Sequence, residues 1–159
     1  MTTMNRKQLL AILRYLKAPV DAYDLGTNMR LDACYDVEQT DQGWETYLAE
    51  RGSKYYVQIF DNETDACLEL LHSVMHLHGS PIIQPMNHRQ TISILNYLCA
   101  PASLYCLHSQ HPSAHYFDMN YTAQGWEVFF AANGEKCDVA IFDNETDACL
   151  DLLYKVMHR

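Results

Sequence analysis

A ten-residue run, Ile59 to Leu68, recurs letter for letter at Ile141 to Leu150, and this repeat constrains the fold more than any other feature of the sequence. Sliding the chain by the same 82 positions aligns residues 5–77 with 87–159 without a gap, and 35 of the 73 aligned pairs are identical. A repeat of this length exceeds a solenoid unit and approaches a small domain. The sequence therefore predicts two similar domains, residues 1–79 and 80–159.

Each copy begins with a predicted helix. Asn5 with Gln8, and Asn87 with Gln90, have the form of a capping box, and apolar residues follow at helical spacing. The dipeptides Ala18-Pro19 and Ala100-Pro101 end the two helices. The second half of each decapeptide opens a closing helix, in which Asp61 or Asn62 is the expected cap. We interpret the identity of the decapeptides as a consequence of capping and core packing.

Strands are expected between the helices of each copy. Alternation of apolar and polar residues predicts three strands joined by turns at Gln42-Gly43 and Arg51-Gly52-Ser53, and a further short strand is expected near Ala22 to Leu25. The expected fold is therefore α+β, with a helix, an antiparallel meander of three or four strands and a second helix in each copy. The face expected to be buried in copy one carries Tyr35, Val37, Trp44, Thr46, Leu48, Val57 and Ile59.

The opposite face of each sheet mixes carboxylates with aromatic rings, which is unusual for a solvated face and suggests contact with a partner. Packing of the two sheet faces against each other, or cross-strand pairing of the rings, are the alternatives. Together with two acids of the loop that diverges between the copies, the candidate partner-binding residues are Asp24, Asp32, Asp36, Glu38, Glu45, Tyr47, Tyr56, Tyr116, Asp118, Glu127 and Phe129.

The net charge of −9 argues against nucleic acid or an anionic membrane as the direct ligand, since both are bound by neutralising phosphates with Lys and Arg. A basic protein is the expected partner. The sequence has neither the ~18 consecutive apolar residues of a membrane span nor a signal-peptide run, so a cytoplasmic location is expected. The six cysteines form no Cys-x-x-Cys pair and are expected to be free thiols.

Catalysis finds little support in the sequence, which has no Gly-rich phosphate loop and no nucleophile elbow, and we expect neither an enzyme nor a cofactor. His72 and His76 lie one helical turn apart, but copy two has a tyrosine, Tyr154, in place of the first. The divergent loop of copy two contains Cys106, His108, His111 and His115. A metal-dependent enzyme built on this loop stays open as a lesser alternative, although zinc ligands usually come in close pairs.

Two stretches of copy one carry a resemblance to a known family. The run from Gly43 to Lys54 and the run from Phe60 to Cys67 resemble small bacterial immunity proteins encoded beside polymorphic toxins, including those of contact-dependent growth inhibition systems. Copy two matches again at Gly125 to Phe130 and at Phe142 to Cys149, but departs at Ala131 to Gly134.

The resemblance implies a cytoplasmic antitoxin that binds the C-terminal domain of its toxin, expected to be a basic nuclease, and blocks the active site or the path of the substrate. A binding adaptor or subunit unrelated to toxins is the alternative function. Neither reading requires a metal or a cofactor.

Overall fold

The computed structural model describes residues 2–26, 33–76, 86–105 and 114–159. Apart from its first three residues, the chain divides into two compact units, Met4–Gln84 and Pro85–Arg159. The first unit holds α1 (Arg6–Tyr15), β1 (Cys34–Thr40), β2 (Gly43–Glu50), β3 (Ser53–Phe60) and α2 (Glu63–Met75). The second holds α3 (His88–Tyr97), the 3-10 turn η1 (Ala102–Leu104), β4 (His115–Thr122), β5 (Gly125–Ala132), β6 (Glu135–Phe142) and α4 (Glu145–Met157). The expected α+β class is confirmed, and the predicted linker between residues 78 and 85 lies outside the described residues.

Each unit contains an antiparallel sheet of three strands, in the orders β1-β2-β3 and β4-β5-β6. The pairing of Tyr35 with Leu48 recurs at the 82-residue offset as Phe117 with Phe130. The strand expected near Ala22 to Leu25 is instead a single parallel bridge, between Tyr23 and Tyr35. Leu25 takes the left-handed conformation at φ 47°, which ends the extended backbone after this one bridge.

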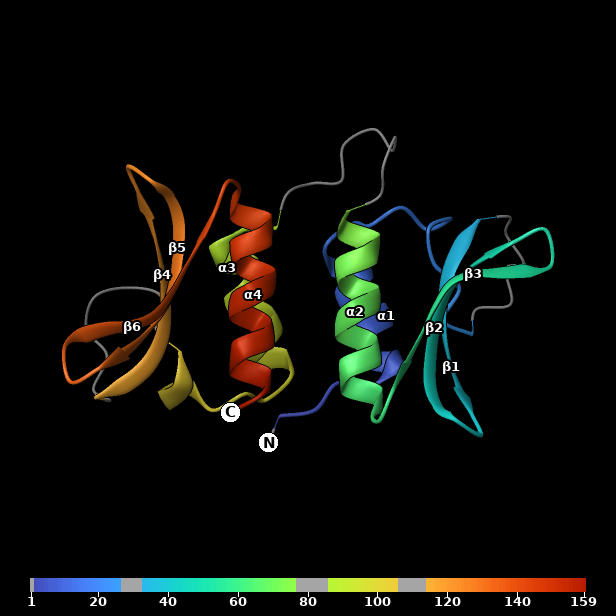
Figure 1. The fold of residues 1–159 in the computed structure, drawn as a ribbon, viewed down its shortest axis with the longest axis horizontal. Coiled ribbons are helices and arrows are strands. Elements are labelled where there is room, and N and C mark those ends of the chain that lie inside the picture. Colours follow the sequence, from blue (N-terminus) through green and yellow to red (C-terminus); the bar gives the residue numbers. More distant parts are fainter. Residues whose placement is uncertain (1, 27–32, 77–85, 106–113) are drawn as a thin grey trace. The chain divides into compact units, whose positions relative to one another are not determined.

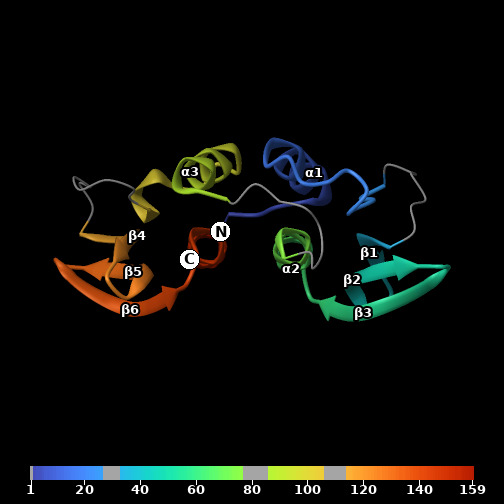
Figure 2. The ribbon, with the colours of Figure 1, turned by 90° about the horizontal axis from the view of Figure 1, so that it is seen from above.

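In each unit the closing helix, α2 or α4, packs against one face of the sheet, and the opening helix, α1 or α3, lies beside the closing helix (Figure 1, Figure 2). The capping boxes predicted at Asn5 and Asn87 are confirmed, since both reciprocal bonds are present in each. Leu9, Leu13 and Leu71 are fully buried where α1 meets α2. The core of each unit therefore lies between its helices and the covered face of its sheet.

A β-bulge in the third strand of each sheet overturns one part of the predicted face assignment. Leu48 pairs with Tyr55 but Thr46 pairs with Gln58, so β3 has one residue more than β2 over this interval. The extra residue shifts the alternation of the side chains, because neighbouring residues of a strand point to opposite faces. Val57 and Ile59, predicted to be buried, are consequently exposed, and the Gln58 side chain donates a hydrogen bond to Glu69 of α2. Val139 and Ile141 of β6 are exposed after the same bulge.

The repeated decapeptide ends the third strand and begins the last helix of its unit. Asn62 is the N-cap of α2 and its side chain accepts a hydrogen bond from the Asp65 backbone N–H, while Asn144 caps α4 in the same way. Cys67 and Cys149 are completely buried, and the Cys149 sulfur lies 4.0 Å from the Met119 sulfur of β4. Capping and core packing thus account for much of the decapeptide, as the sequence indicated.

Candidate partner-binding surface

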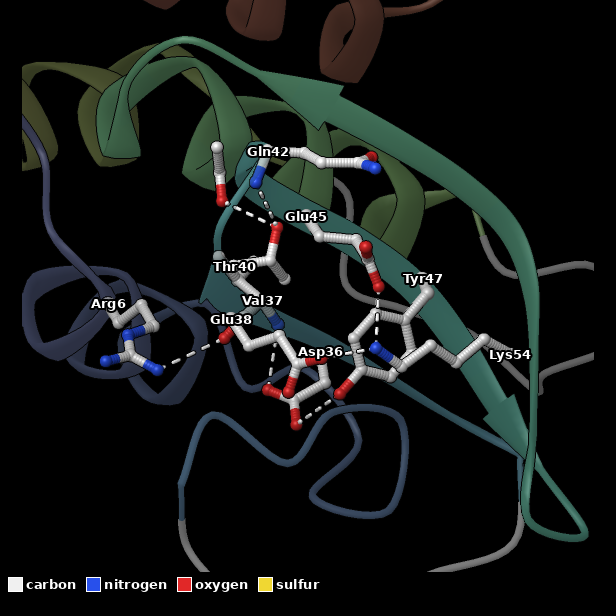
Figure 3. Close-up of polar contacts among 10 residues, drawn as sticks. Arg6, Asp36, Val37, Glu38, Thr40, Gln42, Glu45, Tyr47 and Lys54 are labelled. Atoms are coloured by element: carbon white, nitrogen blue, oxygen red, sulfur yellow. Dashed lines mark hydrogen bonds and ion pairs between the residues drawn. The ribbon is translucent and has the colours of Figure 1, made fainter.

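We call the sheet face that carries Asp36, Glu38, Glu45, Tyr47 and Lys54 the outer face of the first unit. The register places Asp36 opposite Tyr47 and Glu38 opposite Glu45, so that these four side chains project from the same side of β1 and β2. Lys54 joins them from the start of β3, because it pairs with Ala49. Three carboxylates therefore share one sheet face with one ammonium group (Figure 3).

Lys54 is the centre of this group. Its Nζ donates hydrogen bonds to Oε1 of Glu38 and to Oε1 of Glu45, the latter at 2.6 Å, and it lies 4.3 Å from the centroid of the Tyr47 ring. The hydrogen bonds to Glu38 and Glu45 raise the pKa of Lys54. The lysine side chain is 42% exposed, so water screens these ion pairs, and they fix the carboxylates more than they stabilise the fold.

Tyr47 is buried, with 7% of its surface exposed, which corrects the expectation that its ring is an exposed anchor. Lys54 covers the face of the ring, and the hydroxyl donates a hydrogen bond to Oδ2 of Asp36 at 3.4 Å (Figure 3). Burial, together with the charges of Asp36 and Glu38, raises the pKa of Tyr47. Tyr47 therefore holds Asp36 in place rather than offering its ring to a partner.

Asp36 is half-buried. Its Oδ1 accepts a hydrogen bond from the Val37 backbone N–H at 2.8 Å. Burial raises the pKa of Asp36, and this effect outweighs the hydrogen bonds that its carboxylate accepts from the backbone N–H groups of Val37 and Leu25 and from Tyr47. The nearby charge of Asp24 raises the pKa further, which places that predicted residue within electrostatic reach of the outer face.

The second unit repeats the arrangement with fewer charges. Lys136 pairs with Glu127 at 3.2 Å and lies 4.5 Å from the centroid of the Phe129 ring, which is only 5% exposed. Asn120 stands where the first unit has Glu38, so Lys136 has one carboxylate partner here instead of two. Asp118 accepts a hydrogen bond from the Met119 backbone N–H at 2.8 Å, as Asp36 does from Val37.

The other predicted site residues lie apart from this cluster. Tyr56 occupies the bulge of β3 at φ 54° and is 78% exposed, so it is the one predicted ring that projects into solvent. Tyr116 is half-buried near the start of β4. Asp32 lies outside the described residues, as do Cys106, His108 and His111 of the candidate metal loop.

Sequence reasoning missed four exposed aliphatic side chains. Val57 and Ile59 in β3 are each 46% exposed, and Val139 and Ile141 in β6 are each 48% exposed. All four were expected to be buried, because period-two alternation takes no account of a bulge. Val57 and Ile59 are identical to their counterparts Val139 and Ile141, whereas Tyr55, Tyr56 and Gln58 differ from the residues aligned with them in the second copy. This identity is the sequence signal that distinguishes the four exposed residues.

The described thiols include two that are completely buried, Cys67 and Cys149. Burial raises the pKa of Cys67 and of Cys149 to about 12, which keeps both thiols protonated at neutral pH. Among the described residues, no three His, Cys, Asp or Glu side chains are grouped as metal ligands. Nor is any helix in the described ranges long and apolar enough to cross a membrane.

Comparison of the sequence with protein-family models, and comparison of the chain with curated proteins and with solved structures, found no match.

Proposed function

We propose that this protein is an immunity protein, which acts in the cytoplasm and neutralises a cognate toxin by binding its C-terminal domain in a stoichiometric complex. The partner in this proposal is a basic nuclease domain, and the bound immunity protein occludes its active site or the path of its substrate. We further propose that the two units are duplicates of one binding module. No catalytic step is required of this chain.

The outer face of the first unit is the observation that carries the proposal. Asp36, Glu38 and Glu45 are held on the sheet by hydrogen bonds and ion pairs, and Lys54 lies among them. Carboxylates that are already fixed lose little conformational entropy when a partner binds. The resemblance of the Gly43 to Lys54 hairpin to immunity proteins points to the same surface.

Charge supports a cationic partner. The chain carries a net charge of −9, which would attract a basic domain over a distance of about one Debye length and raise its association rate. A nuclease domain presents cations where the nucleic acid phosphates bind. Carboxylates placed against those cations would compete with the substrate.

The test uses the toxin domain encoded beside this gene, in a catalytically inactive form. We expect the two proteins to copurify and to associate more slowly as salt is added. The double variant Glu38→Gln/Glu45→Gln removes two charges without changing side-chain size, and we expect it to weaken binding by about tenfold or more, equivalent to about 1.4 kcal/mol.

Two further variants sharpen this test. Lys54→Met removes the cation that neutralises Glu38 and Glu45, so we expect faster association with a basic domain. Glu127→Gln is the matched change in the second unit and reports whether that unit shares the interface. Absence of a complex between the unmodified proteins would overturn the proposed function, provided that thermal melting shows both proteins to be folded.

A further inference from the structure

Strand β6 forms one edge of its sheet, and among the described residues no strand pairs with its far side. β6 pairs with β5 on one side, and no other described backbone forms a hydrogen bond with it. Figure 1 shows β6 as the strand that leads into α4. Within the part of the chain that the structure describes, the far side of β6 thus has the unpaired backbone that an added strand requires.

Residues 140–142 lack the features that usually block the edge of a sheet. Natural edges are interrupted by bulges, Pro or charged side chains, which prevent another strand from pairing. In β6 the bulge comprises Asp138, with φ 50°, and Val139, which together lie opposite Phe129, and Lys136 lies before it. After the bulge, residues 140–142 pair in regular register with β5, and the sequence Val-Ala-Ile-Phe contains neither Pro nor a charge.

The exposed side chains of this segment are apolar. Val139 and Ile141 are each 48% exposed, and β-branched side chains of this kind suit cross-strand contact with an added strand. The same two residue types are exposed at Val57 and Ile59 in β3, although neither position is needed to fill the core. The edge strand of each unit, β3 or β6, therefore carries two exposed aliphatic side chains at equivalent positions.

Charge distinguishes the two edges. Glu135 and Asp138 are exposed on β6, where β3 has Ser53 and Tyr56 at the equivalent positions. The lysine of β6, Lys136, is paired with Glu127. The β6 edge is thus the more acidic of the two and is the better complement to a strand that carries Lys or Arg.

We propose that residues 139–142 of β6 receive an extended, basic segment of the toxin domain, which adds a fourth strand to the β4-β5-β6 sheet. This inference rests on the proposed function and names the docking mode: backbone hydrogen bonds supply affinity, and Val139, Ile141 and the carboxylates select the segment. A second copy of this chain is the poorer occupant, because two chains of net charge −9 repel each other.

The experiment measures amide hydrogen exchange and affinity with the full chain and the inactive toxin domain encoded beside its gene. We expect backbone amides within residues 139–142 to become protected in the complex. The variant Val139→Ser/Ile141→Ser removes the apolar side chains without adding charge, and we expect it to weaken binding about tenfold or more. The control variant Tyr97→Ser removes a half-exposed ring from the end of α3, outside both sheets, and should change the affinity by less than about threefold.

The outcomes separate this inference from the function on which it rests. If the complex forms but the 139–142 amides stay unprotected, or if Tyr97→Ser weakens binding as much as the β6 variant, the docking edge is wrong and the proposed function stands. If the unmodified proteins form no complex, both fail. A dimer of this chain that forms without toxin and is lost in the β6 variant would identify a second copy as the occupant and would also overturn the inference.

Discussion

Glu63, the first residue of α2, accepts a hydrogen bond from the backbone N–H of Arg6, the first residue of α1, with a donor–acceptor distance of 2.8 Å. Glu145 accepts the corresponding bond from His88 at 3.1 Å. The first N–H groups of a helix have no partner within it, so each closing helix supplies an acceptor to the opening helix of its unit. This bond explains why the repeated decapeptide keeps its glutamate.

Replacing Glu63 with Ala should therefore destabilise the first unit. The Arg6 N–H loses its acceptor, and we expect the free energy of unfolding to fall by about 1–2 kcal/mol. The partly exposed ion pair between Arg6 and Glu63, at 3.8 Å, should add little to this loss. Urea unfolding monitored by circular dichroism would measure the change.

Asp61→Ala provides the control for this variant, because Asp61 is exposed and precedes the cap of α2. We expect its free energy of unfolding to stay within about 0.5 kcal/mol of that of the unmodified protein. Equal effects of the two substitutions would show that the bond to Arg6 contributes nothing specific.

Gly43 cannot be replaced without strain. Its φ is 136°, and a Cβ at this position would lie 2.6 Å from the backbone oxygen of Phe60 in the neighbouring strand. We expect Gly43→Ala to cost about 1–3 kcal/mol. Gly52 has φ 78° but nothing within 4 Å of its added Cβ, so Gly52→Ala should cost about 1 kcal/mol or less. Thermal melting of both variants would test the difference, and a smaller loss for Gly43 than for Gly52 would contradict it.

Thiol labelling should divide the described cysteines into two groups. Cys99 and Cys137 are exposed, whereas Cys34, Cys67 and Cys149 are buried. Because burial raises the pKa of Cys67 and Cys149 to about 12, neither supplies thiolate in the folded protein. Mass spectrometry after brief treatment with N-ethylmaleimide should find Cys99 and Cys137 modified, and Cys67 and Cys149 modified only after denaturation. Rapid native labelling of Cys67 would be inconsistent with this core.

The raised pKa of Asp36 predicts a component of the pH dependence of stability. A carboxyl with a higher pKa in the folded state holds its proton more strongly there than in the unfolded chain. Its contribution to stability therefore falls as the pH rises from the ordinary value of 3.8 through the raised pKa. Asp36→Asn should remove this component, so that the difference in unfolding free energy between variant and unmodified protein changes across that interval. A difference that is constant with pH would show that Asp36 titrates normally.

Local features of this chain could be predicted from its sequence. The capping boxes at Asn5 and Asn87 depend on residues three positions apart, so their signatures are contiguous, whereas the sequence narrowed the cap of α2 to Asp61 or Asn62 and the structure shows Asn62. The α+β class followed from the spacing of apolar residues, and the turns at Gly43 and Gly52 followed from residue type. The repeat itself required only a comparison of the chain with itself.

Features that depend on strand pairing could not be predicted. The bulge residues Tyr56 and Asp138 share no chemical type, and their positive φ values, 54° and 50°, arise from pairing with β2 and β5. That single extra residue moved Val57, Ile59 and their counterparts to the outside.

The sequence by itself thus determined the helices with their caps and the order of the strands, because these are encoded within a few neighbouring residues, and comparison of the chain with itself gave the repeat. Only the tertiary structure decided which side chains remain open to a partner. Lys54 and Lys136 reach across the sheet to cover Tyr47 and Phe129, and Glu63 reaches back 57 residues to Arg6. Burial of a ring or pairing of a charge depends on groups that are distant in sequence, and no local pattern records where they meet.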